Sequence, residues 1–326
     1  MHRNFRTAAA AIVAMICLGL APTAQAQKGK LPGTKSGFVT TADGVKIHYL
    51  EAGKGTIASV TDVDKTNGSY SRKECCGPTI LFVPGWTMPA DIWEHQIAYF
   101  SKTYRVVAMD PRGQGDSSKP SEGYYPAARA RDIKAVVDQL KLEPVVLVGW
   151  SMGVTELAAY VDQFGTDTIA ALVLVDGIAG GDLDPKISLG MFNFAGTFVK
   201  DRAKNTDGFV RFMYKKPQSE EYIKRIVAAS LKTPTNTAAA LFLGTFTTDN
   251  RPALAKMNKP TLIVAAGDEK NNLWMAQYAE MQKRIAGARL EKFTDCGHAL
   301  FVDDPARFNS LLDAFLAAAR QSSTNK

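Results

Sequence analysis

Short apolar runs alternate with amphipathic segments along most of the chain from Gly37 onward. Five of these runs are almost continuously apolar, which is typical of strands that are buried on both faces of a sheet. They cover residues 79–85, 105–110, 145–150, 171–177 and 261–268. A run at 289–295 ends the series, and two earlier runs joined by Asp43 and Gly44 predict an antiparallel pair. The pattern therefore predicts an eight-stranded sheet.

Helical periodicity fills the gaps between the predicted strands. Residues 127–140 place apolar side chains on one helical face, and residues 305–319 repeat that pattern. The segment after Ser151 has a similar stripe, and Gly165 stands where a helix C-cap is expected. Crossovers between parallel strands are right-handed almost without exception, so we expect a doubly wound, mostly parallel α/β sheet.

Two regions interrupt this alternation. Residues 53–78 form a long polar insertion before a central strand, which is either disordered or an extra hairpin. Residues 178–256 are rich in helical patterns and in Met and Phe, and the strand pattern resumes directly after them. We therefore predict a helical cap at 178–256, inserted into a core formed by residues 27–177 and 257–326.

The first 26 residues have the features of a secretory signal peptide. A short basic start is followed by an apolar run and by Ala-Gln-Ala at positions 24–26. The run is short for a membrane span, although a retained N-terminal anchor is the alternative. We predict cleavage after Ala26, a periplasmic or secreted location, and no stable membrane insertion of the mature chain.

Composition narrows the function classes. The chain has 326 residues, of which 46% are hydrophobic, and a net charge of +7. This is enough apolar material for one large core or two modest ones. No Lys/Arg cluster lies beside stacking aromatic residues, so we do not expect a nucleic-acid partner.

The mature chain would retain Cys75, Cys76 and Cys296. The odd count excludes a dense disulfide framework, and no pair has the spacing of a zinc site, so no metal is predicted. Cys75 and Cys76 precede one strand and Cys296 follows another, which places them at opposite ends of a parallel sheet. We predict no bridge to Cys296, and a vicinal Cys75–Cys76 bond or two thiols both stay open.

Gly149, Ser151 and Gly153 form a Gly-x-Ser-x-Gly motif between a buried run and an amphipathic segment. In a nucleophile elbow a strand turns so sharply into a helix that the serine is strained and flanking side chains would clash. The hydroxyl then lies at the helix N-terminus, whose positive end favours developing negative charge. An ordinary turn serine is the alternative, but the strand and helix on either side favour the elbow.

A serine hydroxyl needs a base, and a third group must orient that base. His298 follows the last predicted strand, and Asp268 follows the strand before it. The chain order Ser151, Asp268, His298 is the one expected for a nucleophile elbow of this kind. Asp176, at the end of an earlier strand, is the alternative acid, which we prefer to interpret as a turn residue.

Ester hydrolysis also requires donors for an oxyanion. The predicted donors are the backbone N–H groups of Met152, directly after the serine, and of Trp86, in the loop after the 79–85 run. Gly85 lets the backbone of that loop come close to the serine. We interpret Trp150 as core packing.

Two other polar features are predicted to be structural. The Gly-rich segment 110–120 follows a strand but lacks the spacing of a phosphate-binding loop. We therefore predict a tight loop in which Asp110 and Arg112 brace the neighbouring backbone. His95 is interpreted as part of a helix start rather than as a catalyst.

Residues 37–320 resemble the α/β-hydrolase fold family, in particular its cofactor-free haloperoxidase and aryl-esterase branch. The resemblance rests on LFVPGWTMPADIWEHQ, DPRGQGDSS, LVGWSMG, PTLIVAAGD and DCGHALFVDDPARF. It implies ester hydrolysis with a side activity in peracid formation, no metal or other cofactor, and oxyanion amides at Trp86 and Met152. Pro84 stands where the family has His, and because Pro has no N–H, the hydrogen bonding around this loop must differ.

These features together predict a serine hydrolase for small carboxylic esters. The Met- and Phe-rich cap segment favours apolar or aryl esters, because such walls solvate charge poorly. Perhydrolysis or peroxide-dependent halogenation by the same residues and lactone hydrolysis are alternatives. A non-catalytic binding protein is the remaining one.

Overall fold

The computed structural model describes residues 31, 33–54, 56–63, 70–181, 185–268, 270 and 274–324. The signal peptide predicted for residues 1–26 lies outside these ranges. None of the helices in the described ranges is long and apolar enough to cross a membrane.

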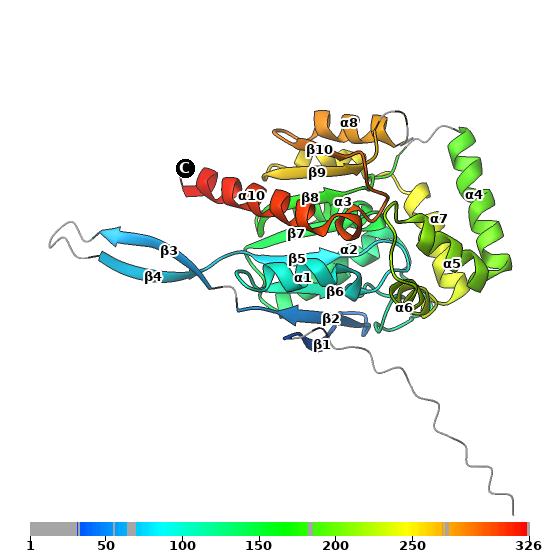
Figure 1. Ribbon diagram of the computed structural model, residues 1–326, viewed down its shortest axis with the longest axis horizontal. Coiled ribbons are helices and arrows are strands. Elements are labelled where there is room, and N and C mark those ends of the chain that lie inside the picture. Colours follow the sequence, from blue (N-terminus) through cyan, green and yellow to red (C-terminus); the bar gives the residue numbers. More distant parts are fainter. Residues whose placement is uncertain are drawn as a thin grey trace, which may run out of the picture. The chain divides into compact units, whose positions relative to one another are not determined.

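The predicted eight-stranded, mostly parallel sheet is confirmed (Figure 1). Its strands, in spatial order, are β1 (Lys35–Thr40), β2 (Lys46–Ala52), β6 (Val106–Met109), β5 (Thr79–Val83), β7 (Val145–Trp150), β8 (Ile169–Val175), β9 (Thr261–Ala266) and β10 (Arg289–Phe293). The pairs β1–β2 and β2–β6 are antiparallel, and the other neighbours are parallel. All eight strands correspond to the predicted runs.

Helices cover both faces of the sheet, as expected for strands that are apolar on both sides. Ile80 and Phe82 of β5 belong to one core, and Leu81 and Val83 to the other. The first core is completed by η1 (Ala90–Trp93), α1 (Glu94–Phe100), α9 (Leu300–Asp303) and α10 (Pro305–Thr324). The second is completed by α2 (Pro126–Gln139), α3 (Met152–Phe164) and α8 (Met275–Arg284).

The polar insertion at 53–78 forms a hairpin. Strands β3 (Thr56–Val63) and β4 (Tyr70–Cys76) pair antiparallel in a two-stranded sheet of their own. The sequence left open whether this insertion is disordered or forms an extra hairpin, and the structure has the hairpin. The side chains of Cys75 and Cys76 lie outside the described part of the chain, so the vicinal bond stays a prediction.

The helix-rich segment between β8 and β9 contains α4 (Pro185–Lys200), α5 (Arg202–Phe212), α6 (Glu220–Ser230), α7 (Thr235–Thr247) and η2 (Arg251–Lys256). We call α4–α7 the inserted helices. Two of them begin at side-chain caps, since Asp201 accepts from the Lys204 N–H and Ser219 from the Tyr222 N–H, both at 3.2 Å. In Figure 1 the inserted helices lie past the carboxyl ends of the parallel strands.

The order of the central strands determines where a site can form. β5 lies between β6 and β7, so the chain leaves β5 toward one side of the sheet and later returns on the other. In open α/β sheets such a switch point leaves a crevice at the carboxyl ends of the strands. Gly85 and Trp86 follow β5 at this point, and Ser151 follows the neighbouring β7.

Candidate active site

Ser151 occupies a sharp turn between β7 and α3, as predicted. Its backbone has φ 55° and ψ −119°, a strained conformation for a residue with a side chain. The Ser151 N–H donates to the carbonyl of Val175 at 2.8 Å, which fixes the turn against β8. The hydroxyl is thus carried at the N-terminus of α3, where the helix dipole favours negative charge.

The glycines on either side of the turn are required by close packing. A Cβ at Gly149 would lie 2.7 Å from the carbonyl oxygen of Gly153, and one at Gly153 would lie 2.7 Å from that of Val83. Neither oxygen belongs to a side chain that could move aside. The steric reason predicted for the two glycines of the motif is therefore confirmed.

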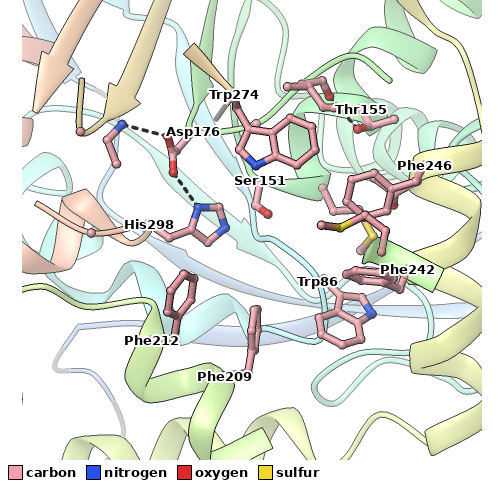
Figure 2. Close-up of a pocket in the computed structure, with 18 of the residues that line it drawn as sticks. Trp86, Ser151, Thr155, Asp176, Phe209, Phe212, Phe242, Phe246, Trp274 and His298 are labelled. Carbon is pink, nitrogen blue, oxygen red and sulfur yellow. Dashed lines mark hydrogen bonds and ion pairs between the residues drawn. The ribbon is translucent and has the colours of Figure 1, made fainter. Parts of the chain in front are cut away.

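His298 is held by a carboxylate. It follows β10 and precedes α9, and its Nδ1 lies 2.6 Å from Oδ2 of Asp176 (Figure 2). The other carboxylate oxygen, Oδ1, accepts from the Ala266 N–H at 2.8 Å and from the Tyr278 hydroxyl at 3.0 Å. Asp176 is only 6% exposed, so these contacts fix both the carboxylate and the imidazole.

The structure corrects our choice between the two candidate acids. The carboxylate at the imidazole is Asp176, the alternative, and not Asp268. Asp176 comes directly after β8, where its own N–H donates to Val264 of β9 at 2.7 Å. Asp268 is partly exposed in the loop after β9, and its Oδ1 accepts from the Lys270 N–H at 2.9 Å.

Ser151 and His298 line the same cavity. Figure 2 shows the imidazole facing the serine hydroxyl, and no hydrogen bond between described residues joins the two side chains. Catalytic hydrogen bonds are often long in a free enzyme and tighten with substrate. The arrangement therefore suits a base that engages the hydroxyl when substrate binds.

Trp150 contributes more than the core packing that we inferred from the sequence. Its indole Nε1 donates to the backbone carbonyl of His298 at 2.9 Å, and the two rings lie 5.1 Å apart. The residue next to the serine thus holds the loop that carries the histidine. Its position beside Ser151 was the only available signal, and the sequence does not reveal what an indole reaches across the fold.

The predicted oxyanion donors flank the serine. A Cβ at Gly85 would lie 2.9 Å from Cβ of Ser151 and 3.4 Å from its Oγ, so the loop after β5 passes directly over the side chain. Among the hydrogen bonds of the described residues, the backbone N–H groups of Trp86 and Met152 are not used. Met152 is the first residue of α3, where such N–H groups have no partner within the helix.

The cavity above the serine has a volume of about 1030 Å³, and nine Phe, Tyr and Trp residues line it. Trp86 forms part of its floor, packing against Phe198 and Phe242 with ring centroids 4.6 and 4.9 Å away. The Trp86 indole also donates to the carbonyl of Ala238 on α7 at 2.7 Å. The other aromatic side chains of the wall include Phe194, Phe209, Phe212, Phe242 and Phe246 from the inserted helices, and Trp274 from the loop between β9 and α8.

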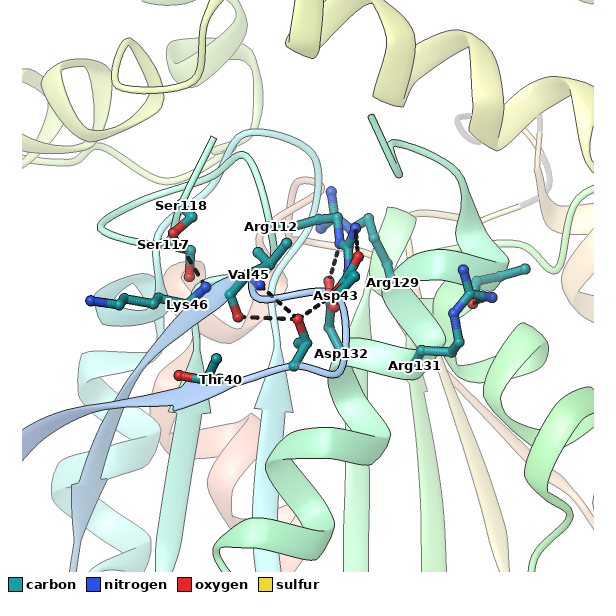
Figure 3. A network of polar contacts seen from close by, with 12 residues as sticks. Thr40, Asp43, Val45, Lys46, Arg112, Ser117, Ser118, Arg129, Arg131 and Asp132 are labelled. Atoms are coloured by element: carbon teal, nitrogen blue, oxygen red, sulfur yellow. Dashed lines mark hydrogen bonds and ion pairs between the residues drawn. The ribbon is translucent and has the colours of Figure 1, made fainter. Parts of the chain in front are cut away.

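The Gly-rich segment after β6 is a structural loop, as predicted. Asp110 accepts from the backbone N–H groups of Ala90 at 2.6 Å and Asp116 at 2.8 Å. Arg112 braces side chains rather than backbone, pairing with the buried Asp132 at 2.6 Å and with Asp43 at 2.9 Å (Figure 3). Together these contacts tie the loop to α2 and to the β1–β2 turn.

A second Ser–His–Asp chain lies at the β1–β2–β6 side of the sheet. Ser36 Oγ and His48 Nε2 are 2.8 Å apart, and His48 Nδ1 lies 2.7 Å from Oδ2 of Asp110. Ser36 is an ordinary strand residue of β1, and neither it nor His48 lines the aromatic cavity. The hydrogen-bond pattern alone therefore does not identify the active site.

Cys296 is a buried free thiol in the loop before His298. Burial raises the pKa of the thiol to about 11, so it stays protonated at neutral pH. Its carboxylate neighbour Asp295 acts in the same direction. A thiol of this kind is a weak nucleophile, which leaves Ser151 as the candidate nucleophile at the cavity.

A family model described as the α/β-hydrolase fold matches residues 78–305, which is more than half of the chain. A non-heme chloroperoxidase of Kitasatospora aureofaciens is 27% identical over 295 residues, covering 85% of this chain and 98% of that protein. A bifunctional esterase/perhydrolase of Acinetobacter calcoaceticus is 34% identical over 143 residues, covering 44% and 45%.

The fold is also similar to solved structures. An esterase from Exiguobacterium antarcticum superposes with a TM-score of 0.72 at 25% identity, covering 86% of this chain and 98% of that one. These relatives agree with the haloperoxidase and aryl-esterase branch that the motifs indicated.

Proposed function

Because the chain belongs to the α/β-hydrolase fold family, we propose that it is a serine hydrolase that cleaves carboxylic esters through an acyl-enzyme on Ser151. The observation that carries this proposal is the contact of His298 Nδ1 with Asp176 at 2.6 Å, beside a strained serine in an apolar cavity. Asp176 fixes the tautomer in which Nε2 is free to take a proton.

The steps follow from the positions of these groups. His298 takes the hydroxyl proton as Ser151 Oγ attacks the ester carbonyl, and the resulting oxyanion accepts hydrogen bonds from Met152 and Trp86 N–H. The carbon–oxygen bond to the alcohol then breaks, and His298 gives its proton to the leaving oxygen. Water, deprotonated by His298, attacks the acyl-enzyme and releases the acid and Ser151.

The substrate is proposed to be an apolar or aryl ester. Aromatic side chains from the inserted helices surround the serine, and the cavity of about 1030 Å³ is at the upper end of the range for small-molecule sites. Such a wall favours apolar surface and gives little solvation to a charged acyl group.

The test compares Ser151→Ala with a matched serine variant. We expect purified Ser151→Ala to lose at least about a thousandfold in kcat on aryl acetates and to resist labelling by a fluorophosphonate probe. Ser36→Ala removes the serine that is hydrogen-bonded to the His48–Asp110 pair outside the cavity, and it should retain both activity and labelling. Parental activity in Ser151→Ala would exclude the proposal.

A second candidate activity is perhydrolysis, which the esterase/perhydrolase and chloroperoxidase relatives favour. Hydrogen peroxide in place of water would attack the same acyl-enzyme and release a peracid. Adding peroxide and bromide to an acetate-containing assay tests this activity, because the peracid oxidises bromide to hypobromous acid, and the bromination of an acceptor is then measured. Its loss in Ser151→Ala would tie it to the same serine.

We also propose that the enzyme is exported and acts in the periplasm or outside the cell. The support is the basic start, the apolar run and the Ala-Gln-Ala sequence within residues 1–26. Mass spectrometry of the secreted or periplasmic protein should give an N-terminus at Gln27. A mature protein that still begins at residue 1 would contradict this.

A further inference from the structure

Gln114 lies in the loop after β6 and is fully buried. It lies beside the loop after β5 that carries Gly85 and Trp86, which we call the oxyanion loop. Its Nε2 donates to the backbone carbonyls of Gly85 at 3.0 Å and Met88 at 2.9 Å. The carboxamide thus spans the loop from one side to the other, and both of its donor hydrogens are used. The Gln114 side chain supplies donors to a segment in which Pro84 offers no N–H.

The contact with Gly85 bears directly on the predicted oxyanion donor. The carbonyl of Gly85 and the N–H of Trp86 belong to the same peptide unit, which is planar, and in a trans peptide the two bonds point in opposite directions. A hydrogen bond that fixes the Gly85 oxygen on the Gln114 side therefore fixes the Trp86 N–H on the other. The Gly85 oxygen also accepts from the Met88 N–H at 3.2 Å, and Gly85 itself lies against Ser151, which places this peptide unit beside the serine.

Gln114 is in turn held by charged side chains. Arg129 of α2 donates from Nη1 to Gln114 Oε1 at 2.9 Å, and its Nε lies 2.7 Å from Oε1 of Glu156. Arg129 and Glu156 are both buried. Glu156 is on α3, the helix whose first N–H, that of Met152, is the other predicted donor.

We propose that Gln114 is a positioning residue that sets the direction of the Trp86 N–H for the oxyanion. A chain of polar contacts runs from α3 through Glu156, Arg129 and Gln114 to the Gly85–Trp86 peptide. It links the two donors on either side of the oxyanion through buried groups. The inference rests on the proposed ester hydrolysis, because only that reaction gives the Trp86 N–H this role.

The test replaces Gln114 by Met, which has a similar volume and no amide. Because a misdirected donor costs less than an absent one, we expect Gln114→Met to lower kcat about tenfold to a hundredfold with KM within about threefold of the parent. Affinity for an aryl boronic acid, which forms a tetrahedral adduct on the serine, should fall by a similar factor. Affinity for the matching aryl methyl ether, which cannot react, should not change.

Gln96 provides a matched control. It is also fully buried, and its Nε2 donates to the Phe301 carbonyl and to Asn309 Oδ1, both at 3.0 Å, away from the oxyanion loop. Gln96→Met should lower the melting temperature as much as Gln114→Met does, with kcat and boronic acid affinity close to the parent. A Gln114→Met enzyme that loses only melting temperature would overturn the proposal.

Gln114→Glu keeps the size of the side chain and an acceptor for Arg129 but removes the donated hydrogens. It should show the same loss in kcat and boronic acid affinity, which keeps the proposal testable if Gln114→Met does not fold. Parental kcat in Gln114→Glu, or failure of both variants to fold, would assign Gln114 to folding alone and overturn the proposal. If the parent is not labelled at Ser151 by a fluorophosphonate, the proposed function fails instead.

Discussion

Asp176, and not Asp268, is the carboxylate that lies at the imidazole of His298. Both follow buried strands, so both were candidates, and Asp268 was chosen because Asp176 was interpreted as a turn residue before Gly177. The choice depends on which of the two carboxylates the folded chain brings to the imidazole, and the structure shows that it is Asp176. Such a contact between residues far apart in the chain is a long-range property that apolar patterning does not encode. Ser151, His298 and the elbow glycines were predictable because each depends on a local motif.

Asparagine variants of the two acids test the assignment. We expect Asp176→Asn to lower kcat by about 10³ to 10⁴, because an amide no longer favours the His298 tautomer needed at the serine. Asp268→Asn should stay within about tenfold of the parent. Steady-state kinetics on an aryl ester, with circular dichroism to verify folding, gives the comparison. A larger loss in Asp268→Asn would return the role to that residue.

At the scale of elements, patterning located all eight strands and the helices α2, α3 and α10. It did not reveal the buried ion pair that joins α2 and α3 in addition to their apolar contacts. Arg129 and Glu156 meet between these two helices, and both are charged types that sequence patterning assigns to the surface. Burial raises the pKa of Glu156 to about 7, an effect that Arg129 only partly offsets.

This pKa has a consequence for stability. Because the folded-state pKa is raised above the ordinary value of 4.5, the native protein holds a proton that the unfolded chain has lost between pH 4.5 and 7. The stability contributed by this group is complete below pH 4.5 and is lost as pH rises through 7. Glu156→Gln cannot ionise, so its free energy of unfolding should lack this decline.

Urea unfolding of the parent and of Glu156→Gln from pH 4.5 to 8 measures the effect. The parent should lose stability relative to the variant by at most about 1.4 kcal/mol per pH unit. Glu280 is a surface residue whose pKa is lowered by its contact with Arg284. Relative to Glu280→Gln, the parent should show no such loss of stability above pH 4.5. A difference between parent and Glu156→Gln that is constant with pH would contradict the prediction.

For the whole molecule, the sequence predicted the sheet and an apolar helical segment, but not the cavity. The wall combines Trp86 of the core with Phe194, Phe209 and Phe242 of the inserted helices. These residues are far apart in the chain and no spacing rule relates them. The composition of the segment indicated an apolar site, while its size and shape required the packing of four helices against the sheet.

Truncating one wall residue should change substrate preference. Phe242→Ala removes a ring that packs on Trp86, so we expect the ratio of kcat/KM for a decanoyl ester to that for an acetyl ester to rise about tenfold. Phe164→Ala truncates a ring at the end of α3, outside the cavity, and should leave the ratio unchanged. The measurement is a chain-length series of aryl esters.

Trp86 belongs to both halves of the active site. Its main chain carries a predicted oxyanion donor, while its indole is bonded to Ala238 on α7 and packed among phenylalanines of the inserted helices. If α7 swings outward to admit a large ester, it must either break this bond or pull the tryptophan with it. In the second case the movement of Trp86 affects both substrate access and the chemical step. With α7 in the open position the Trp86 N–H would be displaced from the oxyanion, and turnover would be slow. Closure of α7 would both enclose the ester and return the Trp86 N–H to its position.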